Sequence, residues 1–141
     1  MHESCDTVLA DSAIKQIDAH EPDFIFLYMV ETDEKGGHDN GRMTEEYLRR
    51  ISVAIDNVKR IIGNFGDKYS VVIMADHGGH DRTHGTQMPE DMNVPLIICG
   101  PDFLAGQTFE NTSLLDIAPT IAAVMKIGSD PEWEGRSLIN K

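Results

Sequence analysis

The sequence is poor in positive charge. Twelve lysine and arginine residues stand against 24 aspartate and glutamate residues, which gives 141 residues a formal net charge of -12. A surface this acidic repels nucleic-acid phosphates and anionic membranes, so we expect neither as a partner. Solubility explains the charge better than a dedicated cationic partner does. The length suits one domain, and a 40% share of hydrophobic residues is enough for a buried core.

Cysteines, long apolar runs and an export signal are also scarce or absent. Cys5 lies near the N-terminus and Cys99 lies in the apolar run VPLIICG, and such different settings do not make a disulfide framework. We expect Cys5 to be exposed and Cys99 to be buried. No apolar run approaches the length of a membrane span. The opening MHESCDTV lacks the pattern of a signal peptide, which favours a cytoplasmic location.

Hydrophobic periodicity predicts two long helices in the first half of the chain. One spans residues 7–20, with Asp6 as a candidate cap and apolar residues recurring on one face. The other spans residues 44–62, with acidic residues in its first turn, and Gly63 is expected to close it.

A third helix is predicted within residues 112–128. Ser113 and Asp116 have the spacing of a capping box, in which each side chain bonds the backbone amide of the other residue. Pro119 falls inside the apolar pattern, so the helix is expected to start or to kink near it. The tail over residues 130–141 is expected to be mostly irregular.

Three apolar runs that are too short for helices are predicted strands, at residues 24–30, 69–75 and 94–100. The first run is continuous and is expected to be buried on both faces. Residues 89–93 are expected to form a polar connector. Strands that alternate with helices predict a single α/β domain over residues 1–141, with a mainly parallel sheet flanked by helices.

A polar loop with several metal-binding residue types follows each of the first two strands. The loops read ETDEKGGHDNG (31–41) and DHGGHDRTHGT (76–86). Their candidate ligands are Asp33 and His38 in the first loop, and Asp76, His77 and His84 in the second. Because ligands of α/β sheets bind beyond the carboxyl ends of the strands, the loops meet on one rim if these strands are parallel neighbours.

Imidazole and carboxylate groups together are typical ligands of zinc, and they also suit manganese or iron. Five of them exceed what one catalytic zinc takes from protein when it keeps an open position. They suit part of a two-metal site, in which ions about 3.5–4 Å apart hold the attacking and leaving oxygens of a phosphoryl group. We therefore expect two divalent metal ions, zinc by preference, with manganese as the alternative.

Five segments, in a fixed order, cover nearly the whole chain: YMVETDEKGGHDNGRMTEEYLRRI, VVIMADHGGHDRTHGT, PEDMNVPLIICGP, LLDIAPTIAAVM and WEGRSL. Together they resemble the C-terminal half of an alkaline-phosphatase-superfamily hydrolase, nearest to the type I phosphodiesterase and nucleotide pyrophosphatase branch. The resemblance implies an alkaline-phosphatase-like fold. It also implies metal-dependent hydrolysis of phosphodiester or nucleotide pyrophosphate bonds in a small phosphate-ester or nucleotide substrate.

The resemblance divides the ligands between two metals: Asp33, His38 and His84 bind one, and Asp76 and His77 bind the other. It gives no ligand role to His80, and Asp81 and Arg82 are expected to fix the loop. The first pair is one residue further apart than the Asp-x-x-x-His spacing of many relatives. Either the loop bulges to keep both ligands, or Glu34 takes the acidic role.

Enzymes of this type also carry, in an N-terminal part, another metal-binding aspartate and a threonine or serine nucleophile. Neither is evident here, since Ser4, Thr7 and Ser12 lack the expected context. We therefore expect a C-terminal fragment of a larger catalytic domain, inactive alone and able to self-associate through an exposed sheet edge. The alternatives are a sulfatase or phosphonate hydrolase of the same superfamily, or a non-catalytic acidic metal-binding module.

Overall fold

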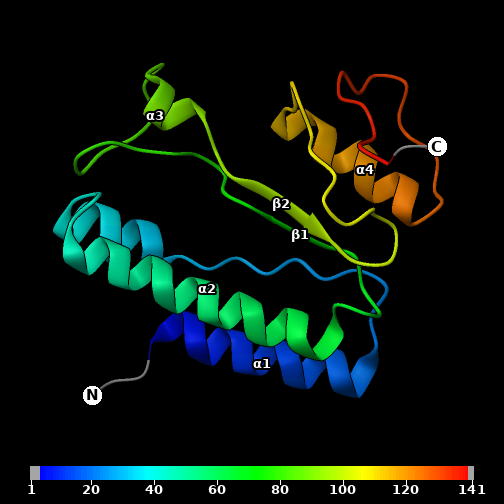
Figure 1. Cartoon of the computed structure of the whole chain (residues 1–141), viewed down its shortest axis with the longest axis horizontal. Helices are drawn as coiled ribbons and strands as arrows, with labels where there is room; N and C mark the ends of the chain where they lie inside the picture. Colours follow the sequence, from blue (N-terminus) through cyan, green and yellow to red (C-terminus); the bar gives the residue numbers. More distant parts are fainter. Residues whose placement is uncertain (1–3, 140–141) are drawn as a thin grey trace. The chain divides into compact units, whose positions relative to one another are not determined.

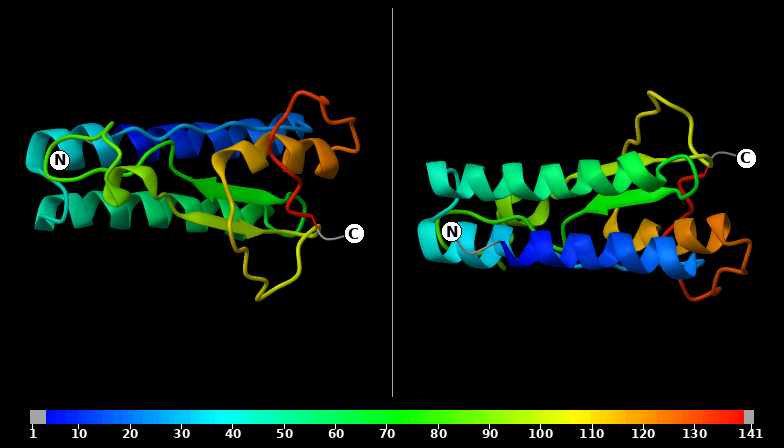
Figure 2. Two further views of the ribbon diagram at one scale, coloured as in Figure 1. Left: turned by 90° about the horizontal axis from the view of Figure 1, so that it is seen from above. Right: turned by 90° about the horizontal axis from the view of Figure 1, so that it is seen from below.

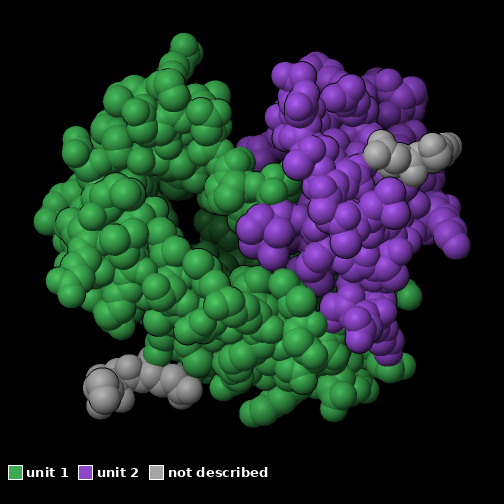
Figure 3. Space-filling model, in the orientation of Figure 1, with its two compact units in different colours: residues 1–65, 74–96 green, residues 66–73, 97–141 purple. Residues whose placement is uncertain are grey.

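The computed structural model describes residues 4–139, and its elements follow one another as shown in Figure 1. The chain divides into two compact units, each assembled from separate stretches of sequence (Figure 3). Unit 1 comprises the residues up to Phe65 together with Met74–Leu96, and unit 2 comprises Gly66–Ile73 and the residues from Ile97 onward. Within residues 4–139, no helix is long and apolar enough to cross a membrane.

Two long helices of unit 1, α1 (Cys5–His20) and α2 (Glu45–Phe65), lie side by side (Figure 2). Polar side chains join them as well as apolar ones. Asn57 of α2 is buried, and its amide group donates a hydrogen bond of 3.2 Å to the Thr7 hydroxyl of α1. Both helices predicted in the first half of the sequence are therefore confirmed.

The end of α2 differs from the sequence prediction. Gly63 lies inside the helix, which continues to Phe65. A glycine ends a helix where the backbone turns into the left-handed region, and Gly63 is not among the residues with positive φ. It keeps the helical conformation instead, at a cost of about 1 kcal/mol relative to alanine.

The sequence suggested that Asp6 caps α1. Instead, Asp6 accepts hydrogen bonds from a distant part of the chain. The N-cap of α1 is Ser4. Asp6 is buried, and its two carboxylate oxygens accept the backbone N–H groups of Val30 and Glu31, each at 3.0 Å. Glu31 in turn accepts hydrogen bonds from the Ser4 hydroxyl and from the Cys5 backbone. The start of α1 and residues 30–31 therefore hold each other in place.

Residues 24–30 do not form the doubly buried strand that their apolar run predicted. They are extended (Figure 1), but within residues 4–139 the only paired strands are β1 (Val71–Met74) and β2 (Leu96–Cys99). Alternate side chains of the run stay exposed, from 37% at Val30 to 79% at Phe26. An apolar run is buried on both faces only where strands pair with it and helices cover it, and the described residues supply it with no strand partner.

β1 and β2 confirm the other two predicted strands, and they run antiparallel. Gly100, directly after β2, lies against Ser70, directly before β1: a Cβ atom on Gly100 would come within 2.5 Å of the Ser70 Cα. The φ of +124° at Gly100 likewise favours glycine. The polar connector ahead of β2 is not irregular throughout, because it contains the one-turn helix α3 (Pro89–Met92).

In unit 2, the capping box predicted from the sequence is present. Ser113 and Asp116 bond reciprocally at the start of a 3₁₀ turn, η2 (Leu114–Asp116), which leads directly into α4 (Ile117–Val124). Pro119 lies in the first turn of α4. Backbone N–H groups in a first turn have no acceptor within the helix, so a proline there costs no helical hydrogen bond.

The tail after α4 is irregular as far as residue 139, as predicted, and is anchored at the start of that helix, while residues 140–141 lie outside the described residues. The buried Asp116 carboxylate accepts the backbone N–H of Arg136 at 2.8 Å. The buried Thr120 hydroxyl accepts the backbone N–H of Leu138 at 2.9 Å. Side chains of η2 and α4 thus replace the backbone partners that the tail lacks.

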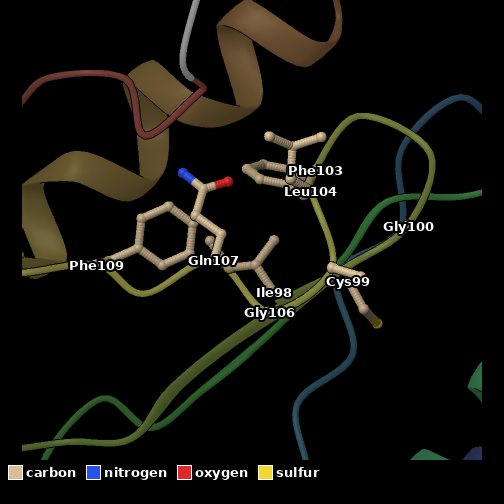
Figure 4. Close-up of a pocket in the computed structure, with 9 residues that line it drawn as sticks. Ile98, Cys99, Gly100, Phe103, Leu104, Gly106, Gln107 and Phe109 are labelled. Atoms are coloured by element: carbon tan, nitrogen blue, oxygen red, sulfur yellow. The ribbon is translucent and has the colours of Figure 1, made fainter.

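An apolar hollow of about 270 Å³ lies beside β2 in unit 2 (Figure 4). Its lining comes from β2 and the turn that follows, and includes Cys99, Phe103 and Phe109. Cys99 is half-buried, which corrects the expectation of full burial, and Cys5 is exposed as expected. Both cysteines are free thiols.

We expect Asp6→Asn to lower the free energy of unfolding by on the order of 2 kcal/mol. An amide has one acceptor oxygen, so the substitution turns an NH₂ group towards one of the two backbone N–H groups that Asp6 now accepts. Urea unfolding followed by circular dichroism measures the change. Asp18→Asn, at an exposed position of α1, is the control. Equal losses in the two variants would contradict this account of Asp6.

Candidate metal centre

The first ligand loop begins with a π-helical turn, η1 (Thr32–His38). Its wide i to i+5 hydrogen bonding accommodates one residue more per turn than an α-helix, and such turns are frequent at functional sites. Asp33 and His38 are five residues apart, so they come to the same side of the turn. The π-helical turn is therefore the bulge that was expected from the extra residue between Asp33 and His38. Glu34 is exposed and does not join these two residues as a candidate ligand.

Three of the candidate ligands meet in unit 1. One side-chain donor atom from each of Asp33, His38 and His84 lies within 4.8 Å of the other two. The Asp33 Oδ2 atom is 3.3 Å from His38 Nε2 and 3.9 Å from His84 Nε2. All three side chains are about one-third exposed, at 32%, 38% and 31%. The cluster is therefore held by the protein and still open to solvent.

The backbone decides which nitrogen of His38 carries the proton. Nδ1 of His38 lies 2.8 Å from the Arg82 carbonyl oxygen, and a carbonyl only accepts, so Nδ1 is protonated and donates. In the neutral imidazole Nε2 is then an unprotonated acceptor, and it faces a second acceptor, Asp33 Oδ2, at 3.3 Å. Two lone pairs this close repel unless a metal ion, or the proton of an imidazolium, lies between them. The donor set therefore fits a metal ion.

Asp76 and His77 repeat this arrangement directly after β1. Nδ1 of His77 lies 2.8 Å from the Gly78 carbonyl oxygen, so Nε2 is again left as the acceptor, 3.7 Å from Asp76 Oδ1. The Tyr28 hydroxyl donates to Asp76 Oδ2 at 3.1 Å. This hydrogen bond and the charge of Asp76 raise the pKa of Tyr28, which keeps the phenol protonated as a donor.

The two groups of ligands adjoin through their histidines. The rings of His77 and His84 stack with centroids 3.7 Å apart and planes 15° from parallel. The His38 and His84 centroids are 5.1 Å apart. The structure thus brings all five predicted ligands into one neighbourhood. Among the described residues, however, only Asp33, His38 and His84 form a cluster of three, and Asp76 and His77 supply two ligands.

The remaining polar residues of the second loop hold it in shape. His80 donates from Nδ1 to Asp91 Oδ1 at 2.8 Å, which agrees with its having no ligand role in the resemblance. The guanidinium of Arg82 donates to the His38 and Asp39 carbonyls, so it ties the second loop to the first, as expected of a loop-fixing residue. The Asp81 carbonyl accepts the backbone N–H of Arg42 at 2.6 Å.

Sequence reasoning missed three residues of this centre, Tyr28, Arg42 and Asp91. Each contacts it across the sequence: Tyr28 is 48 residues from Asp76, and Asp91 is 11 residues from His80. No local pattern marks such pairs. The one available signal for Asp91 was an acidic residue in a connector otherwise expected to be featureless.

Residues 2–129 match the sequence model of the Metalloenzyme superfamily. The chain belongs to this superfamily. A 2,3-bisphosphoglycerate-independent phosphoglycerate mutase of Clostridioides difficile (strain 630) is 30% identical to it, over 94% of this chain and 27% of the mutase. A phosphopentomutase of Clostridium kluyveri (strain ATCC 8527) is 28% identical, over 93% of this chain and 33% of that protein. No solved structure matches the chain.

Superfamily membership confirms the α/β fold class and the alkaline-phosphatase-like resemblance. The finer branch is not shown, because the relatives named here are phosphomutases and not phosphodiesterases or nucleotide pyrophosphatases. The chain spans about a quarter to a third of the length of these curated relatives.

The pair of His80 and Asp91 predicts a pH-dependent stability. Its hydrogen bond to Asp91 raises the pKa of His80, and the same bond holds the pKa of Asp91 far below its usual range. The contribution of His80 is full below the ordinary histidine pKa of about 6.5 and is lost as the pH rises through the raised value. That of Asp91 is present above about pH 4 and lost only in strong acid.

We therefore expect the melting temperature, measured with a chelator present, to fall between about pH 6.5 and pH 9 by more in the wild type than in His80→Gln. Differential scanning calorimetry across this range measures the difference. His20→Gln, at the exposed end of α1, serves as the control and should follow the wild type. Parallel curves for wild type and His80→Gln would show that the pair adds no pH-linked stability.

Proposed function

We propose that this chain is the metal-binding part of an enzyme that transfers phosphoryl groups with two divalent metal ions. The observation that carries the proposal is the pair of acceptors left facing each other, Asp33 Oδ2 and His38 Nε2, at 3.3 Å. A metal ion between these two atoms would satisfy both of them, and His84 Nε2 faces the same Asp33 oxygen. Superfamily membership supports a metal at this position.

In this proposal Asp33, His38 and His84 hold one ion, and Asp76 and His77 hold the second with at least one further ligand. The bound metals would act as Lewis acids that stabilise the negative charge growing on the phosphoryl oxygens. The protein's own part is to present unprotonated nitrogens: carbonyl groups fix the proton on Nδ1 of both His38 and His77. Zinc is our first candidate and manganese the second, since both accept imidazole and carboxylate.

We propose phosphomutase activity as the finer function. The support is the identity to a phosphoglycerate mutase and to a phosphopentomutase, each aligned over more than nine-tenths of this chain. The hydroxyls near the start of the described chain are engaged elsewhere and do not suggest a nucleophile: Ser4 donates to Glu31, and Ser12 donates to the Val8 carbonyl. We infer that the residue that receives the phosphoryl group lies outside residues 4–139.

Hydrolysis of phosphodiester or pyrophosphate bonds is the second candidate. One observation favours it: each ligand of the three-residue cluster is about one-third exposed, so water reaches the site. A hydrolase needs that water as the final acceptor, whereas a mutase has to exclude it while the phosphoryl group changes position. The substrate in either case would be a small phosphate ester.

We expect the chain to bind zinc and manganese weakly, because one site lacks a ligand and both are open to solvent. Isothermal titration calorimetry should show loss of binding heat in Asp33→Ala and in His77→Ala. Asp81→Asn is the matched control, since it removes an exposed carboxylate from the same loop and leaves the donors in place. Equal heats in wild type, Asp33→Ala and His77→Ala would refute the metal assignment.

The type of transfer can be assayed on the longest protein product that contains this chain. A mutase should convert 3-phosphoglycerate or a pentose phosphate to its positional isomer with little release of phosphate, which ³¹P NMR distinguishes. A hydrolase should release phosphate or a nucleotide from bis(p-nitrophenyl) phosphate or a dinucleotide. We expect residues 1–141 alone to catalyse neither reaction, and robust turnover by them would show that the nucleophile lies within this chain.

A further inference from the structure

We propose that Arg42 is a positioning residue that locks the two ligand loops together and commits Asp33 to bind a metal through one oxygen only. This inference rests on the proposed metal site. Arg42 follows the first ligand loop and lies ahead of α2, and it belongs to none of the ligand motifs in the sequence.

Arg42 is an unusually buried cation. Its side chain is 6% exposed, and Nη2 of its guanidinium donates to Asp33 Oδ1. The other oxygen of that carboxylate, Oδ2, is the one that faces His38 and His84. Because the guanidinium engages Oδ1, Oδ2 is the oxygen best placed for a metal, and the arginine fixes the plane of the carboxylate.

The guanidinium of Arg42 fills a notch made by one glycine from each loop. A Cβ atom on Gly79 would come within 2.0 Å of Arg42 Nε, and a Cβ on Gly37 within 2.9 Å of Cζ. A side chain at either position would require the arginine side chain to move. The two glycines therefore leave room for the guanidinium. The loop that contains Asp33 and the loop that contains His77 both pack against it.

One further contact ties the main chain of Arg42 to the site, and one atom of its side chain is left unpaired. Its backbone N–H donates to the Asp81 carbonyl at 2.6 Å, so the second loop holds its main chain as well as its side chain. Its Nη1 atom is buried and has no hydrogen-bond partner among the described residues. A buried unpaired donor costs free energy, and this one lies beside the proposed metal site. A lysine has one nitrogen and no planar fork, so it cannot reproduce this geometry.

Arg42→Lys tests the proposal, because it keeps the charge and removes the fork. We expect it to weaken binding of Mn²⁺ or Zn²⁺ by about 10- to 100-fold, the range for residues that orient a metal ligand. It should also alter the visible spectrum of the Co²⁺-substituted chain, since the coordination of Asp33 changes. Arg49→Lys is the control: Arg49 is half-exposed on α2 and pairs with Glu46. Unchanged affinity and spectrum in Arg42→Lys would overturn the proposal.

Gly79→Ala provides a second test, in which Arg42 itself is not substituted. The new methyl group would displace the guanidinium, so we expect the same loss of metal affinity as in Arg42→Lys. The double variant should bind the metal no more weakly than Gly79→Ala alone, because both substitutions remove the same contact. Gly63→Ala is the matched control, since a Cβ there meets nothing within 4 Å. Fully additive losses would mean that the two residues act separately, against the proposal.

A measurement on the wild type covers the case in which the variants do not fold. The guanidinium NMR signals of Arg42 should shift when Mg²⁺ or Zn²⁺ is added, while those of Arg49 stay in place. Metal binding without any change at Arg42 would contradict the positioning role. Absence of metal binding by the wild type would instead refute the proposed function, so the two failures are distinguishable.

Discussion

The candidate centre depends on backbone carbonyls that fix the protonated nitrogen of its histidines. Imidazole can present either ring nitrogen, and only the unprotonated one binds a metal. The Nδ1–H group of His38 donates to the Arg82 carbonyl and that of His77 donates to the Gly78 carbonyl, which leaves Nε2 as the acceptor in both rings. Each carbonyl belongs to the second loop, so that loop supplies ligands and also orients a ligand of the first.

Charged side chains that are not candidate ligands hold the two ligand loops in position. Asp6 accepts the backbone of residues 30–31, two positions before Asp33, and thereby joins the start of the first ligand loop to α1. Arg82 joins the second loop to the first at the His38 and Asp39 carbonyls. His80 and Asp91 close the far end of the second loop against α3. The two loops are therefore held in their conformation by neighbouring ion pairs and backbone contacts, and not by the ligands themselves.

Features set by neighbouring residues could be predicted from the sequence, and features set by distant ones could not. The capping box of Ser113 and Asp116, the long helices and the two paired strands follow from local spacing. The burial of residues 24–30 required strand partners, and the role of Asp6 required a contact with residues 24 and 25 positions away. The five ligands were recognisable as residue types after strands, but the arginine between their loops had no local pattern.

The same principle explains why the ligand motifs indicate the superfamily but do not show the branch. Stabilising charge on a transferred phosphoryl group makes the same demand on the metals whether water or a second hydroxyl finally receives the group. Ligands selected for that demand therefore look alike in mutases and hydrolases. What separates the two reactions is the acceptor and its access to the site, and both can be set by residues outside the metal loops. The metal loops by themselves therefore do not distinguish the two reactions.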